Sequence, residues 1–566
     1  MGEPLKSITI VGGGTAGWLA ATLLNAYCRQ TSEGQPPMQI TLIESPDIPT
    51  VGVGEATTPG MVRTLKDVGI SEKEFFKTCN ASFKLGVSFD NWNVDKDGKP
   101  FSYINPFVRA PALRGIDMGN YFVNYGGGAQ DFVGTYTATN GLVKALKGPR
   151  ASGTKDYGQG ASFAYHLDAG KFAALLQKHC VQRGVVHILE NVKGVTQDER
   201  GYISGLELEK SGHHPVELVL DCTGFKGMII NEVLKEPFVD YSKYLANDRA
   251  MAVQIPHKDA TKIEPVTRST ALGAGWSWRV PLYNRVGTGY VFSSAHRTDE
   301  EARDELLAHL GHPEGAEPRV IPMRVGRNRN AWVKNCLSIG LSGGFIEPLE
   351  STAIYMIDLA VRWLITYLPD SDFADPLRAR YNKMMDALYN EVRDFICLHY
   401  QLGNRTDSQY WIDARTEMEV PDSLAENLEL WRYAIPQAYD LRFATLFGHN
   451  VYVAVLLGKR VYETDYRKGR IGIGYNLDLG LWQAARKDLR QRTETFVKQA
   501  MDHRTLLTEL RGEAVAPAMP AQQPGNFAFP FGGQATVPMP GMAAPKVKIT
   551  PAAPKLDPVE AGGSML

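Results

Sequence analysis

The fold is decided by the stretch Ile8-Thr9-Ile10-Val11-Gly12-Gly13-Gly14-Thr15-Ala16-Gly17. Its β-branched start is typical of a buried strand, and Trp18 to Leu24 after it favour a helix. Between them the glycines match G-x-G-x-x-G. Gly12 allows a tight turn, Gly14 leaves room for a pyrophosphate, and Gly17 lets the helix lie close to the strand.

A second predicted strand, residues 39–44, ends in an acid. Glu44 lies 27 residues after the last glycine of the motif, compared with a usual spacing of about 20, and the polar insert 29–37 explains the difference as a longer loop. Glu44 can accept a hydrogen bond from a ribose hydroxyl, while the free N–H groups of Thr15 and Ala16 at the helix start face the phosphates. We expect a dinucleotide site, the alternative being a glycine-rich turn without a ligand; the motif does not distinguish FAD from NAD.

The composition is that of an ordinary globular protein. Of 566 residues, 44% are hydrophobic and 22% are charged, and the length allows two or more domains. The formal net charge is −1, so charge gives no reason to expect binding to nucleic acid or to an anionic membrane. The six cysteines are scattered without a C-x-x-C pair, which favours a reducing cytoplasm and argues against a structural metal site. We expect neither a signal peptide nor a membrane-spanning helix, since no uninterrupted apolar run reaches about 18 residues.

Two stretches within the first hundred residues carry candidate site residues. In residues 51–59 the glycines suit a backbone that passes close to another group, so we expect Gly54-Glu55-Ala56 to form part of a strap over the cofactor; a plain connector is the alternative. Residues 82–92 alternate polar and apolar side chains and predict one strand. From alternation alone, Lys84 on this strand is a solvated charge at a sheet edge.

Two predicted strands later in the chain are candidates for the wall of the cofactor site and the wall of a tunnel. Residues 218–225 predict a buried strand that returns beside the first one. Residues 275–282 alternate so that Trp276 and Trp278 point the same way, and Pro281 ends the strand. The two tryptophans are either ordinary core or the wall of a tunnel.

A loop further along the chain predicts an anion site. The strand before it ends in Gly340, which we expect beside the cofactor, and a long apolar helix follows it. Ser351 and Thr352 are natural caps for that helix, whose free N–H groups can bind an anion. Glu350 beside them either weakens anion binding or complements the helix dipole.

These patterns predict an α/β protein in three parts. Residues 1–375 form a Rossmann-like nucleotide-binding module with a mixed β-sheet substrate region, 376–512 form a helical layer, and 513–566, dominated by Pro, Ala, Gly and Met, form a disordered tail. Within the first part, residues 110–160 have little periodicity and predict long loops. His166 is expected to be a hydrogen-bonded structural histidine.

Five of these motifs together resemble the flavin-dependent tryptophan halogenase family. They are Gly12-x-Gly14-x-x-Gly17, Gly52-Val53-Gly54-Glu55-Ala56-Thr57, Phe83-Lys84-Leu85-Gly86-Val87, Trp276-x-Trp278-x-Val280-Pro281 and Phe345-x-x-Pro348-Leu349-Glu350-Ser351-Thr352. The resemblance covers about residues 5–415. It implies an FAD-binding module like those of flavoprotein monooxygenases and glutathione reductase, with a second, helical layer.

The resemblance also implies a source of the halogenating species. Reduced FAD, delivered by a separate NAD(P)H-dependent flavin reductase, reacts with O2. Chloride or bromide bound near Ser351 and Thr352 is thereby oxidised to hypohalous acid. The acid then travels through a tunnel past Trp276, Trp278 and Pro281.

In the mechanism that the resemblance implies, Lys84 and Glu350 are the catalytic residues. Lys84 either hydrogen-bonds hypohalous acid or forms a haloamine, and delivers the halogen to an aromatic carbon. Glu350 polarises the halogenating species and helps to remove the ring proton. The resemblance also leaves a homodimer open.

Three departures from the family pattern bear on the substrate. Asn105 stands where the family has a histidine, whereas Phe107 is retained and can stack on a flat substrate. Ala353 replaces a glycine after the Ser-Thr pair and alters the halide loop. The Glu and Tyr pattern that holds the amino-acid end of free tryptophan is not evident in residues 428–461. We therefore expect an indole or another electron-rich aromatic as substrate.

Three other readings remain open. A flavin-dependent monooxygenase that hydroxylates an aromatic would place its substrate beside the flavin, where Trp276 and Trp278 stand, and would not need Lys84. The others are a flavin- or nicotinamide-using reductase and a non-catalytic flavin-binding protein, which leaves Lys84 and Glu350 unexplained. Dependence on halide separates a halogenase from all three.

Overall fold

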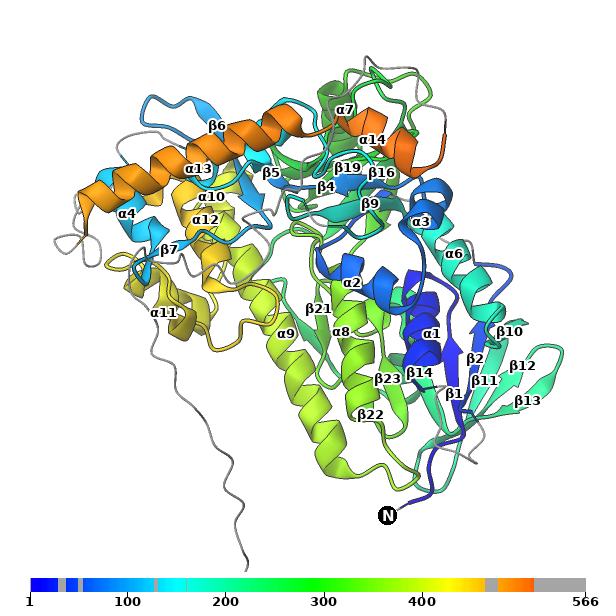
Figure 1. Cartoon of the computed structure of the whole chain (residues 1–566). Coiled ribbons are helices and arrows are strands. Elements are labelled where there is room, and N and C mark those ends of the chain that lie inside the picture. The colour runs from blue at the N-terminus through cyan, green and yellow to red at the C-terminus, as the bar shows by residue number, and fades with distance from the viewer. Residues whose placement is uncertain are drawn as a thin grey trace, which may run out of the picture. The chain divides into compact units, whose positions relative to one another are not determined.

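A parallel sheet built around β1 (Ser7–Val11) forms one layer of the structure (Figure 1). The computed structural model describes residues 2–28, 37–48, 54–126, 131–158, 160–463 and 477–513. Neighbouring strands of the sheet are parallel except for its last pair. In order, the strands are β10 (Val186–Leu189), β2 (Gln39–Glu44), β1, β14 (Leu218–Asp221), β23 (Cys336–Ser338) and β22 (Trp332–Val333). The predicted strands at 8–11 and 39–44 are thus confirmed, as is the return of a later strand beside the first.

The glycine motif joins this sheet to α1 (Thr15–Cys28) as predicted. Gly12 has φ +117°, and a Cβ there would overlap the carbonyl oxygen of Cys222 at the end of β14. A Cβ at Gly17 would overlap the carbonyl oxygen of Gly12, so both positions require glycine for backbone packing. At Gly14, by contrast, a Cβ would meet no atom within 4 Å.

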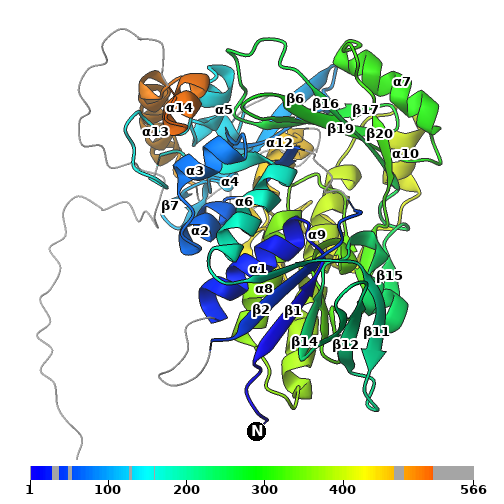
Figure 2. The same cartoon turned by 90° about the vertical axis from the view of Figure 1, so that its right-hand side faces the viewer.

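A seven-stranded mixed sheet forms the second layer, above the parallel sheet in both ribbon views (Figures 1 and 2). Only β5 and β17 within it run parallel. In order, the strands are β20 (Arg319–Pro322), β16 (Arg249–Ile255), β19 (Val286–Phe292), β18 (Gly275–Pro281), β17 (Thr267–Leu272), β5 (Gly86–Val94) and β6 (Pro100–Pro106). β18 ends at Pro281, as the sequence predicts.

The strand predicted at 82–92 is in fact two strands in two sheets. β4 (Ser82–Lys84) pairs with β9 (Ala164–Asp168), which also pairs with β3 (Gly54–Ala56), whereas β5 belongs to the larger sheet. The break lies at Leu85, whose N–H donates to the carbonyl oxygen of Pro265 (2.8 Å). The prediction of a solvated edge for Lys84 is also wrong, because its side chain is fully buried.

Helices cover the parallel sheet and connect it to the upper layer. α1 packs between α6 (Ala169–Val181) and α8 (Ala353–Thr366), and α9 (Asp375–Gln401) runs beside α8 toward β5 and β6 (Figure 1). The last part of the helical layer predicted at 376–512 is two helices, because the chain leaves helical geometry at Ala500 and Asp502 caps a new helix. The loops predicted at 110–160 also contain short helices. The further helices are α2 (Gly60–Asp67), α3 (Glu72–Thr78), α4 (Met118–Tyr125), α5 (Thr139–Lys144), α7 (Asp299–Leu310), α10 (Gln409–Thr416), α11 (Asp422–Leu430), α12 (His449–Gly458), α13 (Leu479–Gln499) and α14 (His503–Leu510).

Short strands complete the described part of the chain. They are β7 (Ala112–Leu113), β8 (Ile116–Asp117), β11 (Val192–Gln197), β12 (Ile203–Leu208), β13 (Gly212–Pro215), β15 (Phe238–Asp240), β21 (Gly326–Asn328) and β24 (Gly344–Phe345). The architecture is therefore the predicted one: a Rossmann-like α/β module, a mixed-sheet region and a C-terminal helical layer. Among the described residues, no helix is long and apolar enough to cross a membrane.

Some of the predictions fall outside the described residues. These are the insert at 29–36, Gly52 and Val53 of the strap, and the tail from 514 onward. All described residues belong to one compact unit, Met1–Gly532. The division of the folded part at residue 375 remains a prediction.

The two glycines at 12 and 14 should respond differently to a side chain. Gly12→Ala introduces a backbone overlap at positive φ, so we expect the free energy of unfolding to fall by about 2 kcal/mol or more. Gly14→Val enters open space, so we expect a near-parental melting temperature but no retention of a flavin dinucleotide, whose pyrophosphate needs that space. Differential scanning fluorimetry and flavin fluorescence measure the two effects; a folded Gly14→Val protein that still binds FAD would refute the assignment.

Candidate active site

The first part of the site is a cradle for a dinucleotide at the carboxyl end of β1. The open space at Gly14 lies before the N-terminus of α1, where Thr15 and Ala16 begin the helix. Glu44 at the end of β2 reaches over Gly13, whose Cβ would overlap the Glu44 carboxyl group. The backbone N–H groups at the start of α1 fit a pyrophosphate, and the carboxyl group of Glu44 fits a ribose.

Gly340 and His187 complete this cradle from two other elements. Gly340 has φ +74°, and a Cβ there would lie 2.8 Å from Cβ of Ala16, so glycine lets the chain pass the start of α1. His187 on β10 places Nε2 3.1 Å from Oε2 of Glu44. The contact between His187 and Glu44 could not be predicted from the sequence, because no motif marks β10 as a neighbour of β2.

The described part of the strap is the strand β3. Gly54 passes Gly287 of β19 so closely that a Cβ would lie 3.2 Å from its Cα, which confirms the expected close approach, here to protein backbone. Glu55 and Ala56 pair with β9. Burial raises the pKa of Glu55 to about 7, so this carboxyl group can change its charge near neutral pH.

Lys84 is the centre of the second part of the site. Its side chain has no exposed area, and Nζ donates to the carbonyl oxygen of Thr57 (2.9 Å). Nζ also lies 5.3 Å from the ring centroid of Phe107. Burial lowers the pKa of Lys84 from 10.5 to about 7, and the nearby charge of Glu350 only partly opposes this. An amine that is partly neutral at pH 7 can act as a nucleophile as well as a hydrogen-bond donor.

Glu350 is held by two residues that are distant in sequence. Nδ2 of Asn105 on β6 donates to Oε1 of Glu350 (3.0 Å). Nε2 of His399 on α9 lies 3.0 Å from the same oxygen, with the ring N–H off the line of an ideal hydrogen bond. The structure therefore brings Lys84, Phe107, Asn105 and Glu350 together as one cluster.

The paired tryptophans lie side by side on β18. The ring centroids of Trp276 and Trp278 are 6.4 Å apart in an edge-to-face arrangement. Nε1 of Trp276 donates to Oε2 of Glu347 (2.7 Å), and the ring of Trp278 covers Gly289 of β19, where a Cβ would overlap it. The carbonyl oxygen of Pro281 accepts a hydrogen bond from Ser82, beside β4.

The predicted anion loop has an unusual backbone. Ser351 has φ +58°, in the left-handed region, and it is buried together with Thr352. Thr352 is the N-cap of α8, but no side-chain hydrogen bond caps the helix, so the prediction of side-chain capping is wrong. The uncapped N-terminus of a 14-residue helix still favours an anion.

His399 and Glu347 contact the candidate site residues, and sequence reasoning missed both. His399 lies near the end of α9, within the predicted helical layer, and only the contact with Glu350 distinguishes it from core. Glu347 accepts three hydrogen bonds on Oε2, from Trp276, Asn247 and Tyr400. The prediction for His166 is confirmed, because both of its ring nitrogens contact hydroxyl groups.

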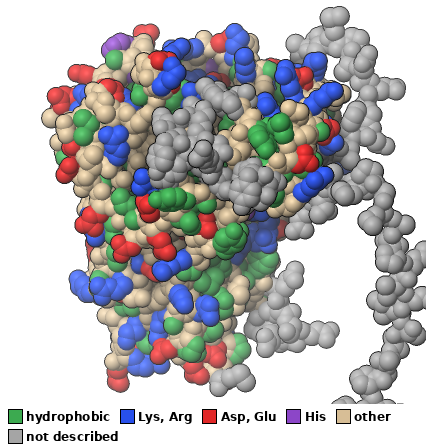
Figure 3. All heavy atoms as spheres, turned by 90° about the vertical axis from the view of Figure 1, so that its left-hand side faces the viewer, with side chains coloured by type: hydrophobic (Ala, Val, Ile, Leu, Met, Phe, Trp, Pro, Cys, Tyr) green, Lys and Arg blue, Asp and Glu red, His purple; other side chains and the backbone are tan. Residues whose placement is uncertain are grey.

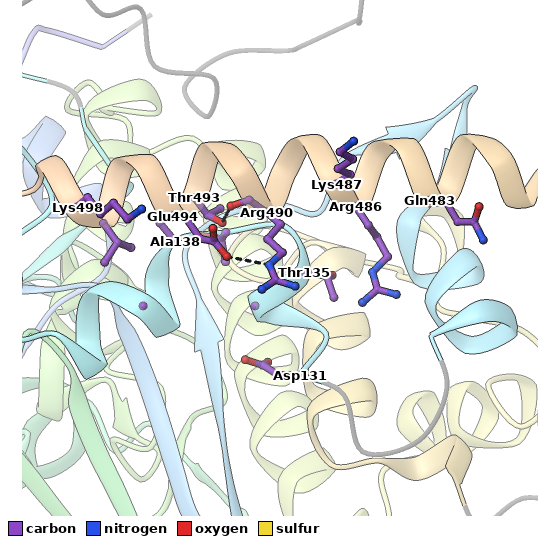
Figure 4. A pocket seen from close by; sticks show the side chains of 14 residues that line it. Asp131, Thr135, Ala138, Gln483, Arg486, Lys487, Arg490, Thr493, Glu494 and Lys498 are labelled. Carbon is purple, nitrogen blue, oxygen red and sulfur yellow. Dashed lines mark hydrogen bonds and ion pairs between the residues drawn. The ribbon is translucent and has the colours of Figure 1, made fainter.

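One cavity lies away from this site. It measures about 890 Å³, lies along α13 and is lined by residues such as Thr135, Arg486 and Arg490 (Figure 4). Its lining residues, all in the described part of the chain, include none of the predicted site residues. Acidic and basic side chains are interspersed on the face shown in Figure 3, in keeping with the net charge. The described residues contain no group of His, Cys, Asp and Glu suited to a metal ion.

The chain is similar to known proteins over most of its length. A family model described as tryptophan halogenase matches residues 7–470. Tryptophan 6-halogenase ThaL of Streptomyces albogriseolus is 35% identical over 453 residues, which is 77% of this chain and 83% of the relative. The crystal structure of a tryptophan halogenase from Shewanella frigidimarina superposes with TM-score 0.84 at 35% identity, covering 90% of this chain and 98% of that one. BrvH, a flavin-dependent halogenase from Brevundimonas sp. BAL3, superposes with TM-score 0.78 at 34% identity, covering 89% and 99%.

The burial of Lys84 should lower the stability of the fold in a pH-dependent way. Its ammonium form is disfavoured only in the folded state, so the penalty is complete below pH 7 and disappears as pH rises to 10.5. The gap between these values corresponds to at most about 5 kcal/mol. Lys84→Met should therefore raise the free energy of unfolding at pH 7, with a smaller gain at pH 10, in urea titrations.

Lys66 on α2 provides a matched control, because its side chain is exposed. Lys66→Met should change stability little at either pH. A Lys84→Met protein that is less stable than the parent at pH 7 would contradict the burial argument.

Proposed function

The chain belongs to the tryptophan halogenase family, and from this premise we propose that it halogenates an electron-rich aromatic, most simply an indole, with reduced FAD, O2 and chloride or bromide. Membership of the family makes it a flavin-dependent enzyme. One observation carries the rest of the proposal: Lys84, whose burial lowers its pKa to about 7, lies over Phe107 and beside Glu350. A buried, partly neutral amine next to a carboxylate is suited to transferring an electrophile and removing a proton.

Residues of the glycine motif would hold the flavin dinucleotide. The open space at Gly14, the free start of α1 and the carboxyl group of Glu44 fit its pyrophosphate and a ribose. Gly340 and the strap residues Gly54, Glu55 and Ala56 would border it. The reduced flavin supplies, with O2, the oxidising power that converts halide to hypohalous acid.

The halide would bind at the start of α8. Ser351 and Thr352 lie there without capping the helix through their side chains, so backbone N–H groups are available to an anion. Glu350 precedes this site, but Asn105 and His399 are directed at one of its oxygens. This supports separate roles for the anion loop and for the carboxylate.

Lys84 would transfer the halogen in two balanced steps. Its lone pair attacks the halogen of hypohalous acid; the N–halogen bond forms, the O–halogen bond breaks, and a protonated haloamine and hydroxide result. A π pair of the aromatic ring then attacks the halogen, the N–halogen electrons return to Lys84 as the lone pair of its neutral amine, and the hydroxide becomes water with the proton that the ring loses. In the alternative, the ammonium form donates a hydrogen bond to the acid and releases hydroxide as water when the ring attacks.

Glu350 would then accept the ring proton. The C–H bonding pair returns to the ring and restores its aromaticity, while the proton moves to the carboxylate. Phe107, close to Lys84, would stack on the flat substrate and orient the carbon to be halogenated. Burial of Lys84 and Glu350 keeps water away from the acid, which otherwise reacts without selectivity.

Trp276 and Trp278 would separate the flavin from the substrate. Their edge-to-face pair is anchored by Glu347 and by close packing on Gly289, so the wall is rigid. A hydroxylase needs its substrate beside the flavin, and such a wall would obstruct it. The hypohalous acid is small enough to pass along the wall.

The side chains of residues 428–461 support an indole without an amino-acid end. Tyr439 is exposed, Tyr452 packs against Phe395 and Trp431, and Glu429 pairs with Arg432. A site that binds the amino-acid end of tryptophan would need such Tyr and Glu side chains to be unpaired and to point toward one another. Free tryptophan, the substrate in the name of the relative ThaL, is therefore less favoured here.

The sequence contains one dinucleotide motif, so we expect a separate NAD(P)H-dependent flavin reductase to supply reduced FAD. We also expect a cytoplasmic enzyme, because all six cysteines are free thiols. A homodimer remains an expectation from the family.

Mass spectrometry of reactions with FAD, a flavin reductase, halide and a panel of indoles tests the function. We expect halogenated product only with bromide or chloride present, more from indole than from free tryptophan, and at an electronically activated carbon. Bromide should be preferred, because it is more easily oxidised and Ala353 alters the anion loop. Hydroxylated product without halide would favour the monooxygenase, and efficient regiospecific halogenation of the benzene ring of tryptophan would refute the substrate assignment.

Substitutions at Lys84 and Glu350 test the chemistry. Lys84→Ala should still bind FAD and oxidise reduced flavin, while product per flavin oxidised falls about 100-fold or more. Lys84→Arg should fail as well, because guanidinium keeps its proton and cannot form a haloamine in the same way. Glu350→Gln should lose part of the activity, since it keeps the shape but not the charge. Near-parental halogenation by Lys84→Ala would show that this lysine has no catalytic role.

A further inference from the structure

The two glutamates of the loop before α8 are each held by only one carboxylate oxygen. Asn105 and His399 both contact Oε1 of Glu350, and among the described residues no hydrogen bond or ion pair reaches its Oε2. Trp276, Asn247 and Tyr400 all donate to Oε2 of Glu347, whose Oε1 is buried without a partner. One oxygen of each group is thus fixed and the other is left uncommitted.

Consecutive residues of α9 make this arrangement. His399 contacts Glu350 and Tyr400 donates to Glu347 (2.7 Å), so the last turn of α9 reaches both ends of the loop. His399 has no exposed area. Its ring stacks on Phe89 at a centroid distance of 4.5 Å and meets the edge of Phe395 at 5.1 Å. Such an aromatic cage leaves the ring little freedom to turn.

Tyr103 on β6 sets the tautomer of His399. Its Oη lies 3.2 Å from Nδ1 of His399. Burial, reinforced by the charge of Glu350, raises the pKa of Tyr103 well above its usual value, so its hydroxyl keeps the proton and donates. Nδ1 of a neutral His399 is then the acceptor, which places the ring proton on Nε2, next to Oε1 of Glu350.

The groups around His399 favour its neutral form. Burial lowers the pKa of His399 below 6.5, and the charge of Glu350 only partly opposes this. The positive charge of Lys459, at the end of α12, lowers the pKa of His399 further. Lys459 itself donates to Asn93 (2.8 Å) and lies over the rings of Trp92 and Tyr103. Above the His399 pKa, the ring can orient the carboxylate without neutralising it.

We propose that His399, oriented by Tyr103, is a positioning residue that fixes Oε1 of Glu350 so that Oε2 is free to take the ring proton of the substrate. The proposal rests on the proposed function and extends it to a residue that does not touch the substrate. Asn105 contributes an amide donor to the same oxygen, Oε1, so the carboxylate is held from β6 as well as from α9.

The proton transfer that His399 supports is balanced. The ring C–H pair returns to the ring, the proton binds Oε2 of Glu350, and the carboxyl group remains hydrogen-bonded through Oε1. The proton leaves to water with the product. Without His399 the carboxylate can rotate, and removal of the ring proton becomes slow enough to limit turnover.

The kinetic isotope effect on kcat tests this role. Indole and indole deuterated at its ring carbons are compared in separate assays of the full chain with FAD, a flavin reductase and bromide. The parent should show an effect close to unity, because a ring that carries a positive charge loses its proton quickly. His399→Phe should lower kcat about tenfold or more, with a clearly larger isotope effect, while KM, flavin oxidation and melting temperature stay near parental.

Two further variants keep the test decisive if His399→Phe folds poorly. His399→Gln retains an amide donor and should keep more activity than the phenylalanine variant. Tyr103→Phe keeps the ring but removes the hydroxyl, and should raise the isotope effect in the same direction. His296→Asn is the matched control, because His296 also places Nε2 near a carboxylate, at 2.9 Å from Asp413, and it should behave as the parent does.

Each result bears on one claim. A parental kcat in the His399 variants, or a lower kcat with a parental isotope effect, overturns the positioning role and leaves the proposed function intact. Absence of halide-dependent product from the parent overturns the proposed function, and this inference with it.

Discussion

Removal of water from one amine is the constraint on which the site depends. Lys84 is enclosed by β9, the strap and the loop before α8, and in the described part of the chain its ammonium group has one hydrogen-bond acceptor, the carbonyl oxygen of Thr57. An exposed lysine would stay protonated at neutral pH and would not react with a halogen electrophile. The enclosure lowers the pKa of Lys84 to about 7, and the associated cost to stability is the price of its reactivity.

The helical layer positions side chains of the candidate site. α9 carries His399 and Tyr400, which contact the two glutamates of the loop before α8. Through Glu347 the same helix reaches Trp276 of β18. The position of the Glu350 carboxylate therefore depends on packing between α9 and the mixed sheet, where His399 stacks on Phe89.

The glycines divide into those that the fold requires and those that a ligand requires. Gly12 and Gly17 are constrained by neighbouring backbone, whereas Gly14 faces open space. Only a glycine that faces open space, such as Gly14, can be explained by a bound dinucleotide. Gly54 was expected to approach a ligand, but it packs against Gly287. The glycine at position 54 is therefore needed at least for the contact between two sheets.

The sequence by itself determined the α/β class, the strand–glycine–helix unit at residues 8–24, β2 and α8. Each follows from a local property: a β-branched run, a glycine spacing or a long apolar run. The family resemblance, not the local pattern, singled out Lys84 and Glu350 as candidates, and it could do so because the motifs that carry them are short and contiguous. The break at Leu85 was not predictable, since the N–H there bonds to Pro265, far along the chain.

Only the tertiary structure decided how those residues behave. Burial of Lys84 comes from atoms of segments that are remote in sequence, and desolvation has no signature in a local pattern. The contact of His399 with Glu350 likewise joins a helix to a loop, and the aromatic cage around His399 comes from β5 and α9. A local pattern can specify a strand or a helix because its hydrogen bonds are mostly local, but the charge state of a side chain depends on everything that surrounds it.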